Sequence, residues 1–225
     1  MANIFFAKSI LSGFQEGKSV RFGIFMLMWI IALAVVIVGI IKWVDLWNQV
    51  SGQDAAGVIG VILSQLIFLI LLYVLFQILV IRASDVLNVE AYDSDFTVIP
   101  VMSVLARTVG ELMAALFIFV GIMRLLVLWF AGYIPYSSYG YDMFFFGILG
   151  GEGFKGGIYA LVEGVVQAFA IIVIAYFVAE FIILSLKMYL DIKKIREVSD
   201  GYEKAAPPKP EEPRPPETRP EEPKP

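Results

Sequence analysis

Four long apolar stretches dominate the pattern of the chain. They cover residues 22–41, 57–81, 112–131 and 158–186. An α-helix rises 1.5 Å per residue, so about 20 apolar residues cross a hydrocarbon core of roughly 30 Å. The pattern therefore predicts an all-α integral membrane protein with four helices, arranged as two antiparallel transmembrane hairpins. We expect a transmembrane domain at residues 22–190, with spans at about residues 22–43, 57–81, 108–131 and 158–187.

The first apolar stretch is too long for the apolar core of a signal peptide. It is followed directly by Lys42, Trp43, Val44 and Asp45 rather than by small residues that suit cleavage. We interpret it as an uncleaved first span.

Residues 1–21 form a separate cytoplasmic N-terminal amphipathic segment. Ile4, Ala7, Leu11 and Phe14 recur at spacings of three and four, which is typical of one apolar helix face. Three interpretations remain open. The segment lies on the membrane surface as an interfacial helix, it packs under the bundle as a helix, or it is a poorly ordered start of the chain.

The last part of the chain, residues 191–225, begins as a basic juxtamembrane segment and changes character near Glu203. Nine of the 11 prolines fall between Pro207 and Pro225, interleaved with charged residues. Such a stretch buries almost no apolar surface, so we expect a disordered tail with polyproline II character. A solvated spacer and a docking ligand for a proline-binding groove are the two hypotheses for it.

The distribution of basic residues predicts the orientation in the membrane. Three groups of them share one side of the predicted bundle, nine residues in all: Lys8, Lys18 and Arg21; Arg82 and Arg107; Lys187, Lys193, Lys194 and Arg196. The other side has two, Lys42 and Lys155. Because basic residues favour the cytoplasmic side, we expect both termini in the cytoplasm. The sequence shows no targeting extension, and we therefore expect the bacterial inner membrane.

The predicted outer loop, residues 132–157, is rich in aromatic residues and glycine. Three interpretations are open: a short helix in the membrane interface, a segment that dips into the membrane, and a contact surface for a neighbouring subunit. Its glycines lack the spacing and the strand-to-helix context of a phosphate-binding loop, so we expect no nucleotide site.

Composition narrows the possible chemistry. The chain has no cysteine and no histidine. This excludes thiolate nucleophiles, disulfides and the residues that form most zinc and haem sites. We expect no catalytic residues, no metal and no cofactor. The predicted partners are membrane lipids and either other membrane subunits or further copies of the chain, and we expect no nucleic acid partner.

Four charged residues lie within or at the edge of the third and fourth spans: Glu111, Arg124, Glu163 and Glu180. Such residues are costly in a membrane and are therefore candidates for function. Counted from the outer loop, Arg124 and Glu163 lie at similar depth, which predicts an intramembrane ion pair. Gln167, one turn from Glu163, is expected beside the same polar spot.

A second polar group is expected near the opposite boundary. It comprises Gln77, Arg107, Glu111 and Glu180, with Arg82 and Lys187 on the same side. Either these charges and the predicted pair are structural, or Glu163 and Glu180 mark the two ends of an ion or proton path. Tyr176 is the only polar residue between Ala168 and Ala179, which favours the structural interpretation.

These observations favour a non-catalytic accessory or scaffold subunit that packs against larger membrane partners. The alternative is a small transporter or channel component in which Glu163 or Glu180 is the coupling acid. The predicted spans contain no proline, whereas broken helices are common in transporters.

Overall fold

The computed structural model describes residues 18–47, 54–89, 98–131 and 152–205. All but three residues at the ends of these ranges are helical, in the elements α2 (Lys18–Trp47), α3 (Ala55–Asn88), α4 (Val98–Ala131) and α5 (Gly153–Ala205). Each of the four is long and apolar enough to cross a membrane, so the prediction of an all-α protein with four apolar helices is confirmed. The helices contain the four apolar stretches and extend beyond them.

Several predictions concern other parts of the chain. The N-terminal amphipathic segment up to residue 17, the outer loop from 132 to 151 and the proline-rich tail from 206 lie outside the described residues. The basic segment that follows residue 190 is described as far as residue 205, where it continues helix α5. The chain divides into two compact units, Met1–Ser185 and Leu186–Pro225.

Local sequence accounts for several helix ends. Asp54 is the N-cap of α3, and its carboxylate accepts a hydrogen bond of 2.8 Å from the backbone N–H of Gly57. Pro100 lies in the first turn of α4, where its missing N–H is not needed. The first residue of α5, Gly153, has a φ of 61°, a conformation that glycine adopts without strain.

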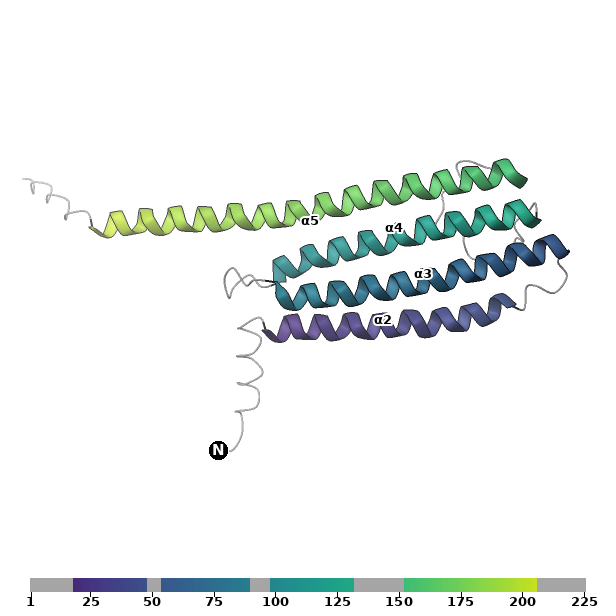
Figure 1. Cartoon of the computed structure of the whole chain (residues 1–225). Helices are drawn as coiled ribbons and strands as arrows, with labels where there is room; N and C mark the ends of the chain where they lie inside the picture. The colour runs from purple at the N-terminus through teal and green to yellow at the C-terminus, as the bar shows by residue number, and fades with distance from the viewer. Residues whose placement is uncertain (1–17, 48–53, 90–97, 132–151, 206–225) are drawn as a thin grey trace, which may run out of the picture. The chain divides into compact units, whose positions relative to one another are not determined.

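Consecutive helices of the first unit run antiparallel and side by side (Figure 1). Near the start of α2, Arg21 donates a hydrogen bond of 2.6 Å to the carbonyl of Val89, just after the end of α3. At the opposite end, the start of α3 approaches the end of α4, where a Cβ on Gly60 would lie 2.8 Å from Phe130 Cβ. Helices α3 and α4 therefore pack directly against each other, and the two predicted hairpins share one core.

Two clusters of buried apolar residues form that core. The first joins α2 and α3 to the start of α4 and consists of Met28, Ala32, Leu79, Ala83, Val86 and Val101. The second joins α3 and α4 and consists of Leu71, Leu75, Ala115, Val120 and Met123. Trp29 and Phe76 add an edge-to-face contact between α2 and α3, with ring centroids 6.1 Å apart.

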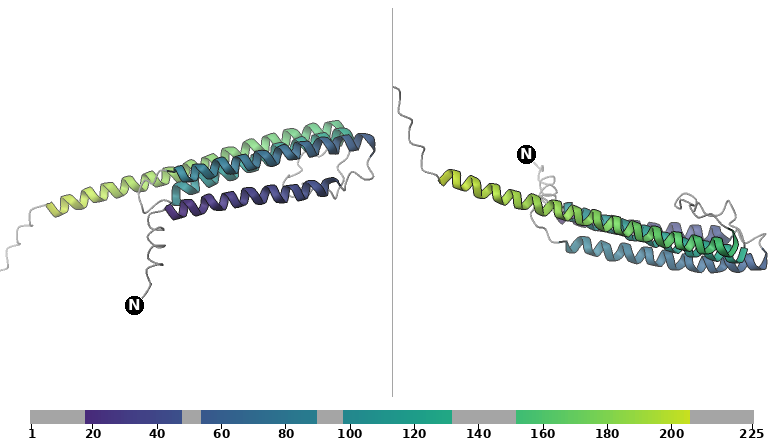
Figure 2. Two further views of the ribbon diagram at one scale, coloured as in Figure 1. Left: turned by 60° about the horizontal axis from the view of Figure 1, so that its bottom comes forward. Right: turned by 90° about the horizontal axis from the view of Figure 1, so that it is seen from above.

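Helix α5 packs on α4 through small residues. A Cβ on Gly121 would lie 3.1 Å from the carbonyl oxygen of Ala160 and 3.5 Å from Cα of Gly164, so the two backbones nearly touch. Further along, Gly110 faces Ala175. Close approach through small residues is the usual way for membrane helices to associate. The further views also place α5 alongside α4 (Figure 2).

The end of α4 is also tied to the start of α5 by aromatic contacts. Trp129 stacks on Phe154 with ring centroids 4.9 Å apart, and its indole N–H donates a hydrogen bond of 3.3 Å to the Phe154 carbonyl. Tryptophan is enriched at membrane–water interfaces, so a stack of this kind is typical of an interface at this end of the two helices.

Candidate functional site: a polar network across three helices

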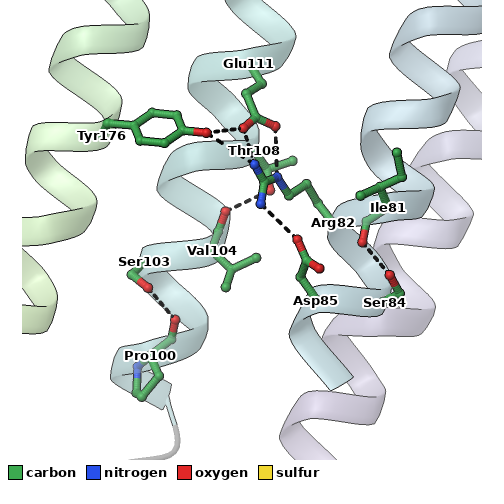
Figure 3. Close-up of polar contacts among 10 residues, drawn as sticks. All are labelled: Ile81, Arg82, Ser84, Asp85, Pro100, Ser103, Val104, Thr108, Glu111 and Tyr176. Carbon is green, nitrogen blue, oxygen red and sulfur yellow. Dashed lines mark hydrogen bonds and ion pairs between the residues drawn. The ribbon is translucent and has the colours of Figure 1, made fainter. Parts of the chain in front are cut away.

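The main polar network of the described residues centres on Glu111, in the middle part of α4. Arg82 on α3 holds its carboxylate with a two-pronged contact (Figure 3). Arg82 Nε donates to Glu111 Oε2 at 2.9 Å, and Arg82 Nη2 donates to Oε1. Both side chains are largely enclosed, with 22% of Arg82 and 21% of Glu111 exposed. This bidentate geometry is the strong form of an arginine–carboxylate pair.

Helix α5 joins the network through Tyr176. Its hydroxyl donates a hydrogen bond of 2.7 Å to Glu111 Oε1 and accepts one of 3.3 Å from Arg82 Nη2. The tyrosine ring points from α5 toward the carboxylate on α4 (Figure 3). One residue from each of three helices thus contributes to a single network.

The remaining donors of Arg82 point toward the end of α3. Arg82 Nη1 donates to Asp85 Oδ2 at 2.8 Å, one turn along the same helix. Asp85 is more exposed than Glu111, with 39% of its side chain accessible. Arg82 therefore lies between two carboxylates, and each of them accepts from it (Figure 3).

Arg107 approaches the network from the start of α4. Its guanidinium carbon lies 5.3 Å from the centroid of the Tyr176 ring, within the range of a cation–π interaction. Tyr176 therefore contacts charged groups in two ways, with its hydroxyl on Glu111 and with its ring on Arg107.

Two other members of the predicted inner group do not enter this network. Gln77 donates a hydrogen bond of 3.0 Å to the hydroxyl of Tyr73 on its own helix. Glu180 is exposed on α5, and it forms no hydrogen bond or ion pair with another residue in the described ranges. The structure thus brings Arg107 and Glu111 together, while Gln77 and Glu180 lie apart from them.

The hydroxyl groups beside the network are engaged within α4. Thr108 donates to the carbonyl of Val104 at 2.8 Å, and Ser103 donates to the carbonyl of Pro100 at 2.7 Å (Figure 3). Such bonds to the preceding turn satisfy a hydroxyl inside a helix. These two hydroxyls are therefore already hydrogen-bonded within α4.

The second predicted site, at Arg124 and Glu163, lies on the α4–α5 contact. Glu163 is 7% exposed and accepts a hydrogen bond of 3.1 Å from Gln167, as the spacing predicts. Its neighbour Gly164 packs on Gly121, and Arg124 follows Gly121 by one turn. Arg124 and Glu163 are therefore within about one turn, roughly 5 Å, of the same level along the helices. Their ion pair stays a prediction.

Arg82 and Tyr176 are the network residues that sequence reasoning did not place at the site. The sequence places Arg82 only on the same side of the membrane as Glu111, and it shows Tyr176 only as the one polar residue in its part of the fourth span. The available signal is depth for Glu111 and Tyr176, which lie 20 and 18 residues from the outer ends of their predicted spans at residues 131 and 158. Depth does not specify which helix faces meet.

Among the described residues, no group of three or more acidic, histidine or cysteine side chains is placed to hold a metal ion. Comparisons of the chain with protein-family models, with curated proteins and with solved structures give no match.

Proposed function

We propose that the protein is a non-catalytic integral membrane subunit that packs against larger membrane partners. The observation that carries this proposal is the closed network of Arg82, Glu111 and Tyr176. Both carboxylate oxygens of Glu111 accept hydrogen bonds from the neighbouring helices. A network satisfied in this way holds helices in register, because its polar groups already have protein partners.

The outward face of α5 supports the same proposal. Its large exposed apolar residues include Val162, Val166, Phe169, Val173, Phe177 and Phe181. Phe169 and Phe177 are 71% and 69% exposed, while the opposite face presents small residues to α4. One helix thus offers bulky apolar contact surface to lipid and to membrane proteins, and polar groups are directed into the bundle.

Our proposal places the protein in the bacterial inner membrane with both termini in the cytoplasm. The support for this orientation is the asymmetry of basic residues together with four consecutive antiparallel helices. The proline-rich tail would then extend into the cytosol.

Gentle extraction from the native membrane tests the proposed function. The chain, tagged and produced at its natural level, is solubilised in a mild detergent and weighed by native mass spectrometry. The expected result is a defined complex that contains other membrane proteins. Phe169→Ala with Phe177→Ala should release a partner bound on α5, whereas the matched outward change Ile37→Ala with Ile41→Ala on α2 should retain it. A homogeneous homo-oligomer that conducts ions after reconstitution would contradict the proposal.

A transporter or channel component is the second candidate function. The observation in its favour is the burial of Glu163, a carboxylate inside a span with only 7% of the residue exposed. In this alternative Glu163 is the coupling acid, and Glu163→Gln abolishes transport in vesicles while the exposed change Glu180→Gln leaves it intact. Assembly with a fixed set of membrane partners, and no flux in vesicles, would exclude it.

A further inference from the structure

The side chain of Arg107 is held in place by Tyr176, yet its guanidinium has N–H donors that are not hydrogen-bonded to the described residues. The side chain is partly exposed, and the guanidinium is held over the ring of Tyr176. Its Nε is buried without a hydrogen-bond partner, and no carboxylate of the described residues lies within ion-pair distance of it. An arginine presents five N–H donors, so most of them remain available to a further group.

Two acidic groups of the network are already engaged by other residues. Glu111 accepts from Arg82 and from Tyr176, and Asp85 accepts from Arg82. The hydroxyl of Thr108, the residue next to Arg107, donates to Val104. Among the described residues, neither these carboxylates nor the Thr108 hydroxyl engages Arg107, so its N–H donors stay available to a further group.

The distance of Arg107 from Trp129 along α4 indicates which layer of the membrane surrounds it. It precedes Trp129 on the same helix by 22 residues, which corresponds to about 33 Å along the axis. The stack of Trp129 on Phe154 is typical of a membrane interface at that end of α4. Because the hydrocarbon core is roughly 30 Å thick, Arg107 lies at the headgroup layer of the opposite leaflet.

We propose that Arg107, positioned by the ring of Tyr176, binds the phosphate of an anionic phospholipid. A guanidinium matches phosphate through two parallel N–H···O hydrogen bonds, and headgroup phosphate is the abundant anion at this depth. Tyr176 acts as the positioning residue, since its ring restrains the guanidinium while its hydroxyl bonds to Glu111. This inference is independent of the proposed scaffold function.

Native mass spectrometry of the purified full-length chain tests the proposal. The protein in detergent is titrated with phosphatidylglycerol, with phosphatidylcholine of the same acyl chains, or with inorganic phosphate. We expect one retained phosphatidylglycerol whose apparent affinity falls about tenfold in Arg107→Gln, the loss of one charge-assisted contact. The matched control Arg196→Gln, on an exposed part of α5, should bind like the wild type.

Three further variants separate binding from folding. Tryptophan fluorescence during heating verifies that each variant is folded. Arg107→Lys keeps the charge and loses the planar fork, so we expect intermediate affinity for phosphatidylglycerol. Tyr176→Phe keeps the ring and should bind like the wild type, whereas Tyr176→Ala should bind more weakly.

Four outcomes would overturn the proposal. Equal retention of phosphatidylglycerol by the wild type and Arg107→Gln would do so. If Arg107→Gln does not fold, an affinity of Arg107→Lys for phosphatidylglycerol equal to that of the wild type would also overturn the proposal. Retention of inorganic phosphate without retention of phosphatidylglycerol assigns the site to an anion from solution. Equal affinity for phosphatidylcholine and phosphatidylglycerol removes the preference for an anionic lipid.

Discussion

Arg82 and Glu111 are 29 residues apart in sequence, yet they form a two-pronged ion pair between α3 and α4. Core residues flank the pair, with Leu79 and Ala83 on either side of Arg82 and Ala115 one turn after Glu111, and the Tyr176 hydroxyl completes it from α5. Its position makes it the polar contact that fixes three helices relative to one another.

The Arg82–Glu111 pair should show strong coupling in a double-mutant cycle. Arg82→Leu or Glu111→Leu alone leaves a largely enclosed charge without its partner, a change that costs about 3–5 kcal/mol. The double variant should regain much of this stability because no unpaired charge remains. The measurement is the thermal unfolding midpoint in detergent. Lys42→Gln, which removes an exposed ion pair with Asp45, should change the free energy of unfolding by less than about 0.5 kcal/mol.

Removal of the Tyr176 hydroxyl should lower stability less than removal of Arg82 or Glu111. Tyr176→Phe loses the hydrogen bonds to Glu111 and Arg82 but keeps the ring beside Arg107. Polar contacts between membrane helices average about 0.6 kcal/mol, so we expect a decrease in stability of that order. Tyr73→Phe is the matched control, because Tyr73 is 63% exposed and its hydroxyl accepts a hydrogen bond from Gln77 on its own helix. Equal unfolding midpoints for the two variants would show that the hydroxyl does not contribute to packing.

Because α4 and α5 pack closely, a methyl group added at their contact should lower stability, whereas one added at an open position should not. A Cβ at Gly164 would collide with the backbone carbonyl of Phe117, whereas a Cβ at Gly23 on α2 meets no atom within 4 Å. We expect Gly164→Ala to lower stability by about 1–3 kcal/mol through overpacking. Gly23→Ala should be neutral or stabilising, since alanine favours helix. The two unfolding midpoints measured in one detergent check this difference.

A double-mutant cycle also tests the predicted ion pair between Arg124 and Glu163. Arg124→Leu and Glu163→Leu should each impair folding or assembly, and the combined variant should recover much of the loss. The yield of monodisperse protein in fluorescence-detected gel filtration measures the effect. If the double variant is no better than the worse single variant, the two residues are not partners.

The absence of cysteine from the chain makes orientation accessible to labelling. Single cysteines introduced at Ser19 on α2 and Ser199 on α5 should react with a membrane-impermeant maleimide only after the cells are opened. A cysteine at Lys155, near the start of α5, should react in intact cells. Labelling of residues 19 and 199 from opposite sides would contradict a four-span arrangement.

The sequence by itself determined the class of the protein and the depth of its charged residues. Runs of about 20 apolar residues specify membrane spans because an unpaired backbone cannot remain in hydrocarbon and must form helices there. Counting along each run then places Arg124 and Glu163 near one level, and helical spacing alone brings Gln167 to Glu163.

Only the tertiary structure decided which polar side chains meet. Membrane helices that are apolar on all sides carry no hydrophobic stripe to set their rotation, so their facing surfaces depend on close packing of small residues such as Gly110 on Ala175. That packing turns Tyr176 toward Glu111 and leaves Glu180, one turn away on the same helix, on the exposed surface. Residues at similar depth are thereby divided between a shared network and the outside of the bundle.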